Sequence, residues 1–158
     1  MRSWARITFG GLVLSTLAGV FLGVCAATAN EAEATSYLSN DPRACVNCHI
    51  MREQYDGWQH SGHHAAATCN DCHVPQDFFG KYLTKMEHGY RHSKAFTLQD
   101  FHEPIRITQS SLDVVEDNCL RCHGEFVGDI AGHAGATPGS ARLACVHCHS
   151  RVGHDTRK

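Results

Sequence analysis

Four copies of the pentapeptide Cys-x-x-Cys-His constrain the fold of this chain more than any other feature. They occupy residues 45–49, 69–73, 119–123 and 145–149 and use eight of the nine cysteines. In this motif two thiols add to the vinyl groups of one haem, and the adjacent histidine is placed to bind the iron on its proximal side. We therefore predict four covalently attached c-type haems, bound by Cys45, Cys48, His49, Cys69, Cys72, His73, Cys119, Cys122, His123, Cys145, Cys148 and His149.

Two other uses of paired cysteines are zinc knuckles and a disulfide framework. Neither requires a histidine directly after the second cysteine in every copy. The repeated histidine therefore favours haem over both alternatives.

The chain is too short to build a large apolar core around four haems. Of its 158 residues, roughly 32 per haem remain once an N-terminal leader is set aside. Aromatic residues make up only 8% of the chain, so the haem planes must supply most of the buried apolar surface. We predict an all-α fold of short helices and loops that wrap the haems and do not fold without them.

Charge and histidine content narrow the function further. The formal net charge is −2 before any haem propionates are added, and a nucleic-acid partner would require a basic face, so we expect no nucleic-acid partner. Thirteen histidines are present, nine more than the four that end the motifs. These nine can supply distal ligands to the irons.

The N-terminus carries an uncharged run of 23 residues, 7–29. A helix of that length is about 34 Å long, enough to cross about 30 Å of hydrocarbon. Arg2 and Arg6 precede the run and Glu31 and Glu33 follow it, so the positive-inside rule puts the N-terminus in the cytoplasm. We predict a bacterial inner-membrane protein with a single-pass anchor in residues 1–30 and a periplasmic haem domain in residues 31–158.

A cleaved signal peptide is the alternative for this segment, because residues 27–29 resemble a small-residue cleavage site. The run is longer than the 7–15 residues usual for the apolar region of a signal peptide. That length favours a retained anchor.

The spacing of the motifs suggests two haem pairs within one domain. Their first cysteines stand at 45, 69, 119 and 145, so the two outer gaps are nearly equal and the middle one is twice as long. Helical periodicity is present in residues 50–59, 78–90 and 111–119, and no strand-like alternation is evident. Residues 131–140 are rich in glycine and proline and predict a loop.

Met51 makes the first motif unusual. It follows His49 by two residues, and a methionine thioether is a known haem ligand. The two side chains are too close in sequence to reach opposite faces of one haem, so only one of them takes the proximal position. The residues alone leave the choice between His49 and Met51 open.

The chain resembles the NapC/NirT family of quinol dehydrogenases, and in particular the tetrahaem membrane subunits of cytochrome c nitrite reductases. The N-terminal anchor carries this resemblance together with four segments, residues 45–51, 61–75, 85–93 and 145–154. Between them they span nearly the whole chain.

The resemblance implies a set of iron ligands. Met51 would bind the iron of haem 1, His49 would stay free, and the distal side of haem 1 would open toward the quinol. A lysine of the partner catalytic subunit would complete haem 2, which His73 binds. His123 and His149 would bind haems 3 and 4, with distal ligands supplied by His154 for haem 3 and by His63 or His64 for haem 4.

The resemblance also implies two proton-handling positions near haem 1. Lys85 stands where the family has a lysine. His92 stands where the family has an aspartate, and this is a departure. A histidine can accept a proton near neutral pH, but it can also bind an open iron, so both roles stay open for His92.

The function implied is a quinol dehydrogenase. The chain would oxidise menaquinol at haem 1 and pass electrons to a periplasmic multihaem nitrite reductase that makes ammonia. It would have no nitrite-reducing site of its own and would form an oligomer within the complex. The alternatives are the same module feeding a different periplasmic reductase, and a passive multihaem electron carrier.

Overall fold

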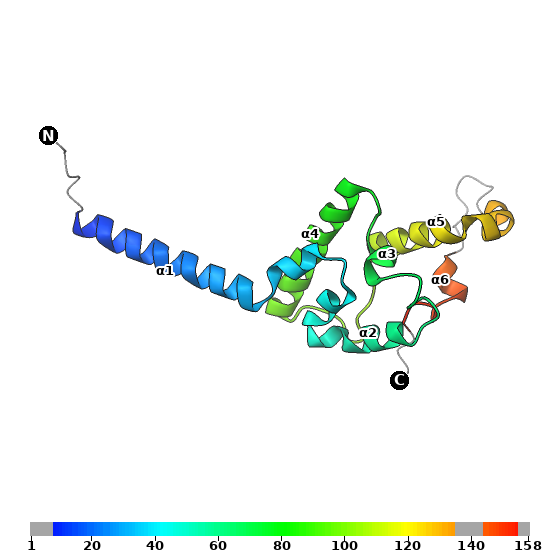
Figure 1. The fold of residues 1–158 in the computed structure, drawn as a ribbon, viewed down its shortest axis with the longest axis horizontal. Helices are drawn as coiled ribbons and strands as arrows, with labels where there is room; N and C mark the ends of the chain where they lie inside the picture. Colours follow the sequence, from blue (N-terminus) through cyan, green and yellow to red (C-terminus); the bar gives the residue numbers. More distant parts are fainter. Residues whose placement is uncertain (1–7, 135–143, 155–158) are drawn as a thin grey trace. The chain divides into compact units, whose positions relative to one another are not determined.

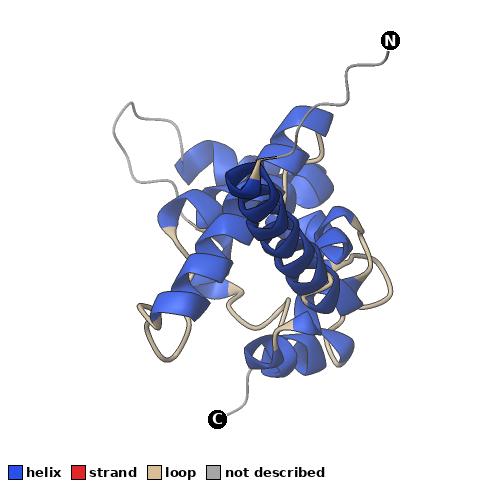
Figure 2. Cartoon of the chain, turned by 90° about the vertical axis from the view of Figure 1, so that its left-hand side faces the viewer, coloured by secondary structure: helices blue, strands red, loops and turns tan. Residues whose placement is uncertain are grey.

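The computed structural model describes residues 8–134 and 144–154 as an all-helical chain, with no strand among them (Figures 1 and 2). Three short 3₁₀ helices follow one another between the first two α-helices. The elements are α1 (Phe9–Glu31), η1 (Ala34–Leu38), η2 (Pro42–Asn47), η3 (His49–Met51), α2 (Arg52–Gln59), α3 (Cys69–His73), α4 (Phe78–Leu98), α5 (Gln109–Ala134) and α6 (Cys145–Cys148).

The chain forms two compact units, residues 1–36 and 37–158. The first contains α1, a 23-residue helix with a mean hydropathy of 2.1 and none of its surface buried. It begins at Thr8, whose hydroxyl accepts a hydrogen bond from the backbone N–H of Gly11. The hydroxyls of Ser15 and Thr16 donate to carbonyls one turn back, so these polar groups are satisfied within the helix, as a membrane span requires.

The three helices expected after the anchor are all present, although two run further than their periodic segments. Residues 78–90 extend to Leu98 in α4, and residues 111–119 lie in the first half of α5, which continues to Ala134. Asp77 begins α4 by accepting a hydrogen bond from Gly80 N at 2.6 Å, and Gln99 ends it in the left-handed conformation, with φ 55°. The loop expected over residues 131–140 is wrong for residues 131–134, because α5 continues to Ala134; residues 135–140 lie outside those described.

The second unit buries very little apolar surface. Among the described residues only one hydrophobic side chain is buried, Val74 at 2% exposed. The other buried side chains are polar: Lys85, Glu116 and Asn118. Packing of this kind cannot by itself offset the conformational entropy of more than a hundred ordered residues, as the sequence analysis anticipated for a haem-filled chain.

Candidate redox site

The four pentapeptides lie on four different elements of the second unit. The first spans η2 and η3, the second forms α3, the third lies inside α5 and the fourth begins with α6. Thr68 starts α3 with a capping box, in which the Asp71 carboxylate accepts hydrogen bonds from both the N–H and the hydroxyl of Thr68, each at 2.8 Å. All nine cysteines are free thiols, which leaves no disulfide framework.

The motifs meet one another in chain order. The thiol of Cys45 in the first motif hydrogen-bonds that of Cys69 in the second, and this contact lowers the pKa of Cys45 to about 7. Cys72 in the second motif lies close enough to Cys119 for the two thiols to interact, and burial together with this contact raises its pKa. Cys119 in turn hydrogen-bonds Cys145 in the fourth. The elements that carry the motifs are likewise neighbours in this order, since η2 contacts α3, α3 contacts α5 and α5 contacts α6.

Two side chains of α5 fix the second motif against the third. The Asn118 amide donates to the carbonyls of Cys72 at 3.0 Å and Val74 at 2.9 Å. Arg121 donates to the carbonyl of Asp71 at 3.2 Å. These bonds satisfy backbone oxygens at the end of α3 that the short helix itself cannot pair.

Glu116, also on α5, holds the fourth motif. Its buried carboxylate accepts hydrogen bonds from the backbone N–H groups of Cys145 at 2.6 Å and Val146 at 3.1 Å. A carboxylate that accepts N–H groups at the first turn of a helix is favoured by both charge and hydrogen bonding. One helix thus carries the third motif and anchors the second and fourth.

Two pairs of histidine rings face each other at the separation expected across an iron. The ring centres of His63 and His123 are 6.1 Å apart with planes at 78°, and those of His73 and His154 are 6.0 Å apart with planes at 12°. Two metal–imidazole bonds of about 2 Å on opposite sides of one iron separate the ring centres by about 6 Å. Direct ring stacking would bring them closer than that.

The surroundings of these rings also suit iron ligands. Nδ1 of His63 donates to the carbonyl of Val152 at 3.0 Å, which leaves Nε2 available for a metal and fixes the ring. Burial and the neighbouring His154 lower the pKa of His73 to about 4, so its ring is neutral at pH 7, as ligation requires. By contrast, His64 packs edge-on against the Trp58 ring, with centres 4.6 Å apart.

These pairs differ from the distal assignments taken from the resemblance. There His154 belonged to haem 3 and His63 or His64 to haem 4. In the structure His63 lies beside His123 of the third motif, and His154 lies beside His73 of the second. Between His63 and His64, only His63 faces a motif histidine.

The choice between His49 and Met51 stays a prediction. Both residues lie in η3, where His49 is exposed and Met51 is partly buried. This helix runs directly into α2 at Arg52, so the two side chains sit within one turn of each other.

Lys85 and His92 come together with the first motif. The ammonium group of Lys85 is buried and donates to the carbonyl of Ser39 at 2.6 Å, and burial lowers its pKa. Nδ1 of His92 lies 3.3 Å from the hydroxyl of Tyr37. Burial raises the pKa of Tyr37, and so do the nearby thiols of Cys48 and Cys45. Both α4 side chains therefore reach the segment that leads into the first attachment motif.

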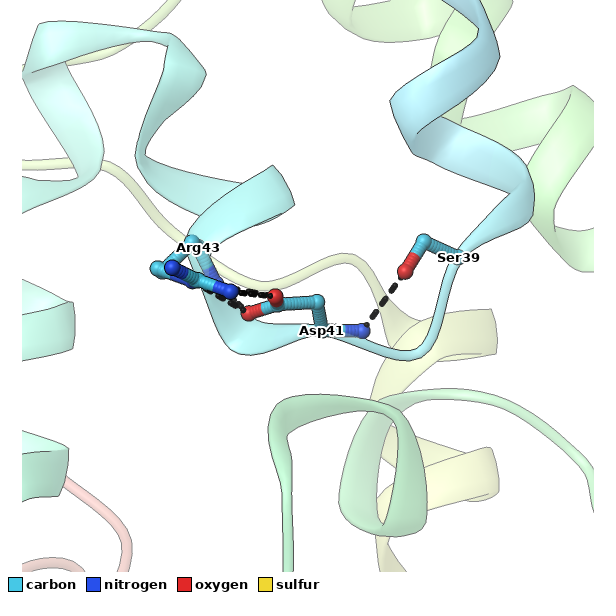
Figure 3. Close-up of polar contacts among 3 residues, drawn as sticks. All are labelled: Ser39, Asp41 and Arg43. Atoms are coloured by element: carbon cyan, nitrogen blue, oxygen red, sulfur yellow. Dashed lines mark hydrogen bonds and ion pairs between the residues drawn. The ribbon is translucent and has the colours of Figure 1, made fainter.

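A local cap shapes the start of that motif. Asp41 accepts hydrogen bonds from the N–H and the guanidinium of Arg43, and its own N–H donates to the Ser39 hydroxyl (Figure 3). The bonds from Arg43 lower the pKa of Asp41. Asp41 is thus the N-cap of η2, the turn that carries Cys45.

Three residues that the sequence analysis did not single out contribute to the site: Tyr37, Glu116 and Asn118. Each acts across a large distance in sequence, for example 46 residues between Asn118 and Cys72. No local pattern marks them, because Glu and Asn inside a helical segment are ordinarily solvent-exposed. The burial of Glu116 and Asn118 and the contact of Tyr37 with His92 are the signals, and they exist only in the fold.

The donor set fits covalent haem. Paired free thiols, two pairs of imidazole rings about 6 Å apart and an apolar core too small for the chain length are together what a haem-filled domain provides. Among the described residues no group of three or more histidine, cysteine or acidic side chains is arranged to hold a metal ion.

Comparison with known proteins gives one consistent answer. The chain is 35% identical to cytochrome c-type protein NrfH of Wolinella succinogenes, covering 94% of this chain and 86% of the relative. It is 33% identical to the cytochrome c nitrite reductase subunit NrfH of Nitratidesulfovibrio vulgaris (87% and 81% covered) and 29% identical to NapC of Escherichia coli (97% and 85%).

A solved structure and a family model agree with these relatives. A crystal structure of the cytochrome c nitrite reductase NrfHA complex bound to the HQNO inhibitor contains a chain with a TM-score of 0.65 and 29% identity, covering 90% of this chain and 92% of that one. The model of the NapC/NirT cytochrome c family, N-terminal region, matches residues 5–158. With its apolar N-terminal helix and its haem-attachment motifs, the chain belongs to the NapC/NirT family of membrane-anchored c-type cytochromes.

Proposed function

We propose that this chain carries four haems, oxidises menaquinol beside the first of them and passes the electrons to a periplasmic NrfA-type nitrite reductase. The observation that carries the proposal is the meeting of Lys85 and His92 with the segment that leads into the first motif. Two relatives named NrfH and a related chain solved in an NrfHA complex support the partner.

Oxidising one quinol to quinone releases two electrons and two protons. When bound, haem supplies the electron acceptor, and protein groups must take the protons. His92 suits this role because burial and the nearby His88 hold its pKa below the ordinary value of 6.5, so the ring is neutral at pH 7. Tyr37, within hydrogen-bond distance of the other ring nitrogen, offers the proton a next position.

Lys85 would orient the quinol. Its ammonium group already donates to backbone oxygens of the 38–40 segment, and such a donor can hold a quinol oxygen in the same place. We propose the cytoplasmic membrane as the site of the anchor and the periplasm as the site of the haem domain, from the charges that flank α1. The chain itself would have no nitrite-reducing site.

The ring pairs support a specific set of ligands. We propose that His63 and His123 bind one iron and that His73 and His154 bind another. We keep Met51 as the proximal ligand of haem 1, with an open distal position. In that arrangement the iron nearest Lys85 and His92 keeps an open position that can meet the quinol.

The test is electron paramagnetic resonance of the full-length holoprotein in detergent, titrated with HQNO. We expect a high-spin ferric signal that shifts as HQNO binds in the wild type and stays unchanged in Lys85→Met. A spectrum of low-spin haems alone, unaltered by HQNO, would refute the quinol site and favour a passive electron carrier.

A second candidate changes only the partner. NapC relatives match 97% of the chain at 29% identity, and TorC matches 70% of it at 25% identity, so the same module could feed another periplasmic reductase. Reduction of purified NrfA-type enzyme by quinol in the presence of this chain, compared with a nitrate reductase as acceptor, separates the two partners.

A further inference from the structure

An exposed apolar stripe runs along the first half of α4. It consists of Phe79, Leu83, Met86 and Tyr90, whose side chains are between 66% and 83% exposed. These positions follow the spacing i, i+4, i+7 and i+11, so at 3.6 residues per turn they lie within about 60° of one another on the helix. Isolated exposed apolar residues need no explanation, but an aligned set on one helix face does.

The stripe faces away from the attachment motifs. Lys85 and His92, which reach the segment before the first motif, lie about 140° around the helix from the centre of the stripe. The side of α4 that contacts the segment before the first motif is therefore opposite to the stripe. The contacts that Lys85 and His92 make do not cover the stripe, so the stripe needs another apolar environment.

The charges of α4 indicate which environment. The helix carries four cationic residues, Lys81, Lys85, Arg91 and Lys94, and one carboxylate, Glu87, although the whole chain has a net charge of −2. Arg91 pairs with Glu87 at 2.8 Å, and Lys94 pairs with Asp100, just beyond the helix, at 3.8 Å. Lys85 is buried, but the residues of the helix still sum to a positive charge. A cationic helix with an aromatic and aliphatic stripe is typical of segments that lie in the interface of a bilayer with anionic headgroups.

The residue of the second unit that Lys85 contacts lies only a few positions after the anchor in the sequence. Ser39, whose carbonyl accepts the hydrogen bond of Lys85, is only eight residues beyond Glu31, the last residue of α1. Eight residues span at most about 28 Å. Lys85, through its hydrogen bond to Ser39, is therefore connected to the end of α1 by a short length of chain.

We propose that α4 is a second membrane contact, with Phe79, Leu83, Met86 and Tyr90 inserted into the headgroup region of an anionic bilayer. The opposite face of the helix, with Lys85 and His92, then lies about one helix diameter, or roughly 10 Å, above the inserted stripe. The proposal concerns lipid contact alone and does not require that the chain oxidise quinol.

The test is photo-crosslinking of the full-length holoprotein in vesicles of phosphatidylethanolamine and phosphatidylglycerol. A photoreactive phenylalanine analogue, p-benzoylphenylalanine, replaces Phe79 in one variant and Phe126 in the other. Phe126 lies on α5 and is 84% exposed, against 83% for Phe79, so the two positions are matched in residue type and exposure. Haem absorbance confirms that both variants are folded before irradiation, and mass spectrometry identifies the adducts.

We expect phospholipid adducts at position 79 in severalfold excess over position 126. Adducts with another protein chain in place of lipid would overturn the proposal and make the stripe a protein interface. Equal lipid adducts at the two positions, or none at position 79, would also overturn it. Because the readout is a covalent lipid adduct, it succeeds or fails independently of any quinol oxidation.

Discussion

Replacing His63 by alanine tests the ligand geometry most directly. The ring centre of His63 lies 6.1 Å from that of His123, the distance at which both nitrogens can bind one iron. In the variant that iron loses one axial ligand and changes from low-spin to high-spin, so one haem's share of the low-spin ferric signal disappears. Among the residues that the structure describes, the variant also loses the hydrogen bond from His63 to Val152. This bond is worth about 1 kcal/mol, which is small beside a typical stability of about 5–15 kcal/mol.

His64→Ala is the matched control. His64 is the next residue, but its ring packs against Trp58, a contact worth about 1 kcal/mol. The control should therefore cost a similar amount of stability and leave every haem in its original spin state. Electron paramagnetic resonance of the oxidised holoproteins measures the spin states, and thermal unfolding measures the stability. If His64→Ala converts a haem and His63→Ala does not, the ligand reasoning is wrong.

Three further predictions concern α4 and α5. Glu116→Ala leaves two partly buried N–H groups, those of Cys145 and Val146, without their carboxylate partner. We expect the free energy of unfolding to fall by about 2 kcal/mol and haem attachment at the fourth motif to be incomplete. Glu116→Gln should recover part of both, and an unchanged melting temperature with full haem mass would contradict this. Because the pKa of His92 is lowered, the rate of quinol oxidation should fall when the pH drops below 6.5 far enough to protonate the ring. The His92→Gln variant should not show this fall at acidic pH. If the fall persists in the variant, His92 is not the proton acceptor. Lys85→Met should reduce kcat/KM for quinol about tenfold, because the variant loses one charged hydrogen bond worth about 1.5 kcal/mol. An unchanged kcat/KM would show that Lys85 does not bind the quinol.

Much of the fold was accessible from the sequence because its signals are local. The uncharged run of residues 7–29 predicted a membrane helix, and α1 occupies Phe9–Glu31. Helical periodicity located α2, α4 and α5, but it placed the end of α4 eight residues too early and expected a loop where α5 still continues to Ala134. Helix ends depend on caps such as Gln99, whose left-handed conformation no periodic pattern reveals.

Part of the candidate site could be predicted from the sequence, and part depends on the fold. The motif residues follow from covalent spacing, and Lys85 and His92 from the family resemblance. Glu116 contacts Cys145 of the fourth motif, 29 residues further along the chain, and Tyr37 contacts His92, 55 residues further along. Such contacts form only when the loops between them close, and that closure depends on the packing of the whole unit.

The sequence by itself determined that this chain has an apolar N-terminal helix and repeated haem-attachment motifs, because both depend on residue type and short spacing. Only the tertiary structure decided that the motifs meet in chain order, that His63 rather than His64 faces a motif histidine, and that α5 holds three motifs together. The physical reason is that ligand geometry and buried hydrogen bonds are set by distances in space, and these follow from how separated segments pack rather than from any one segment.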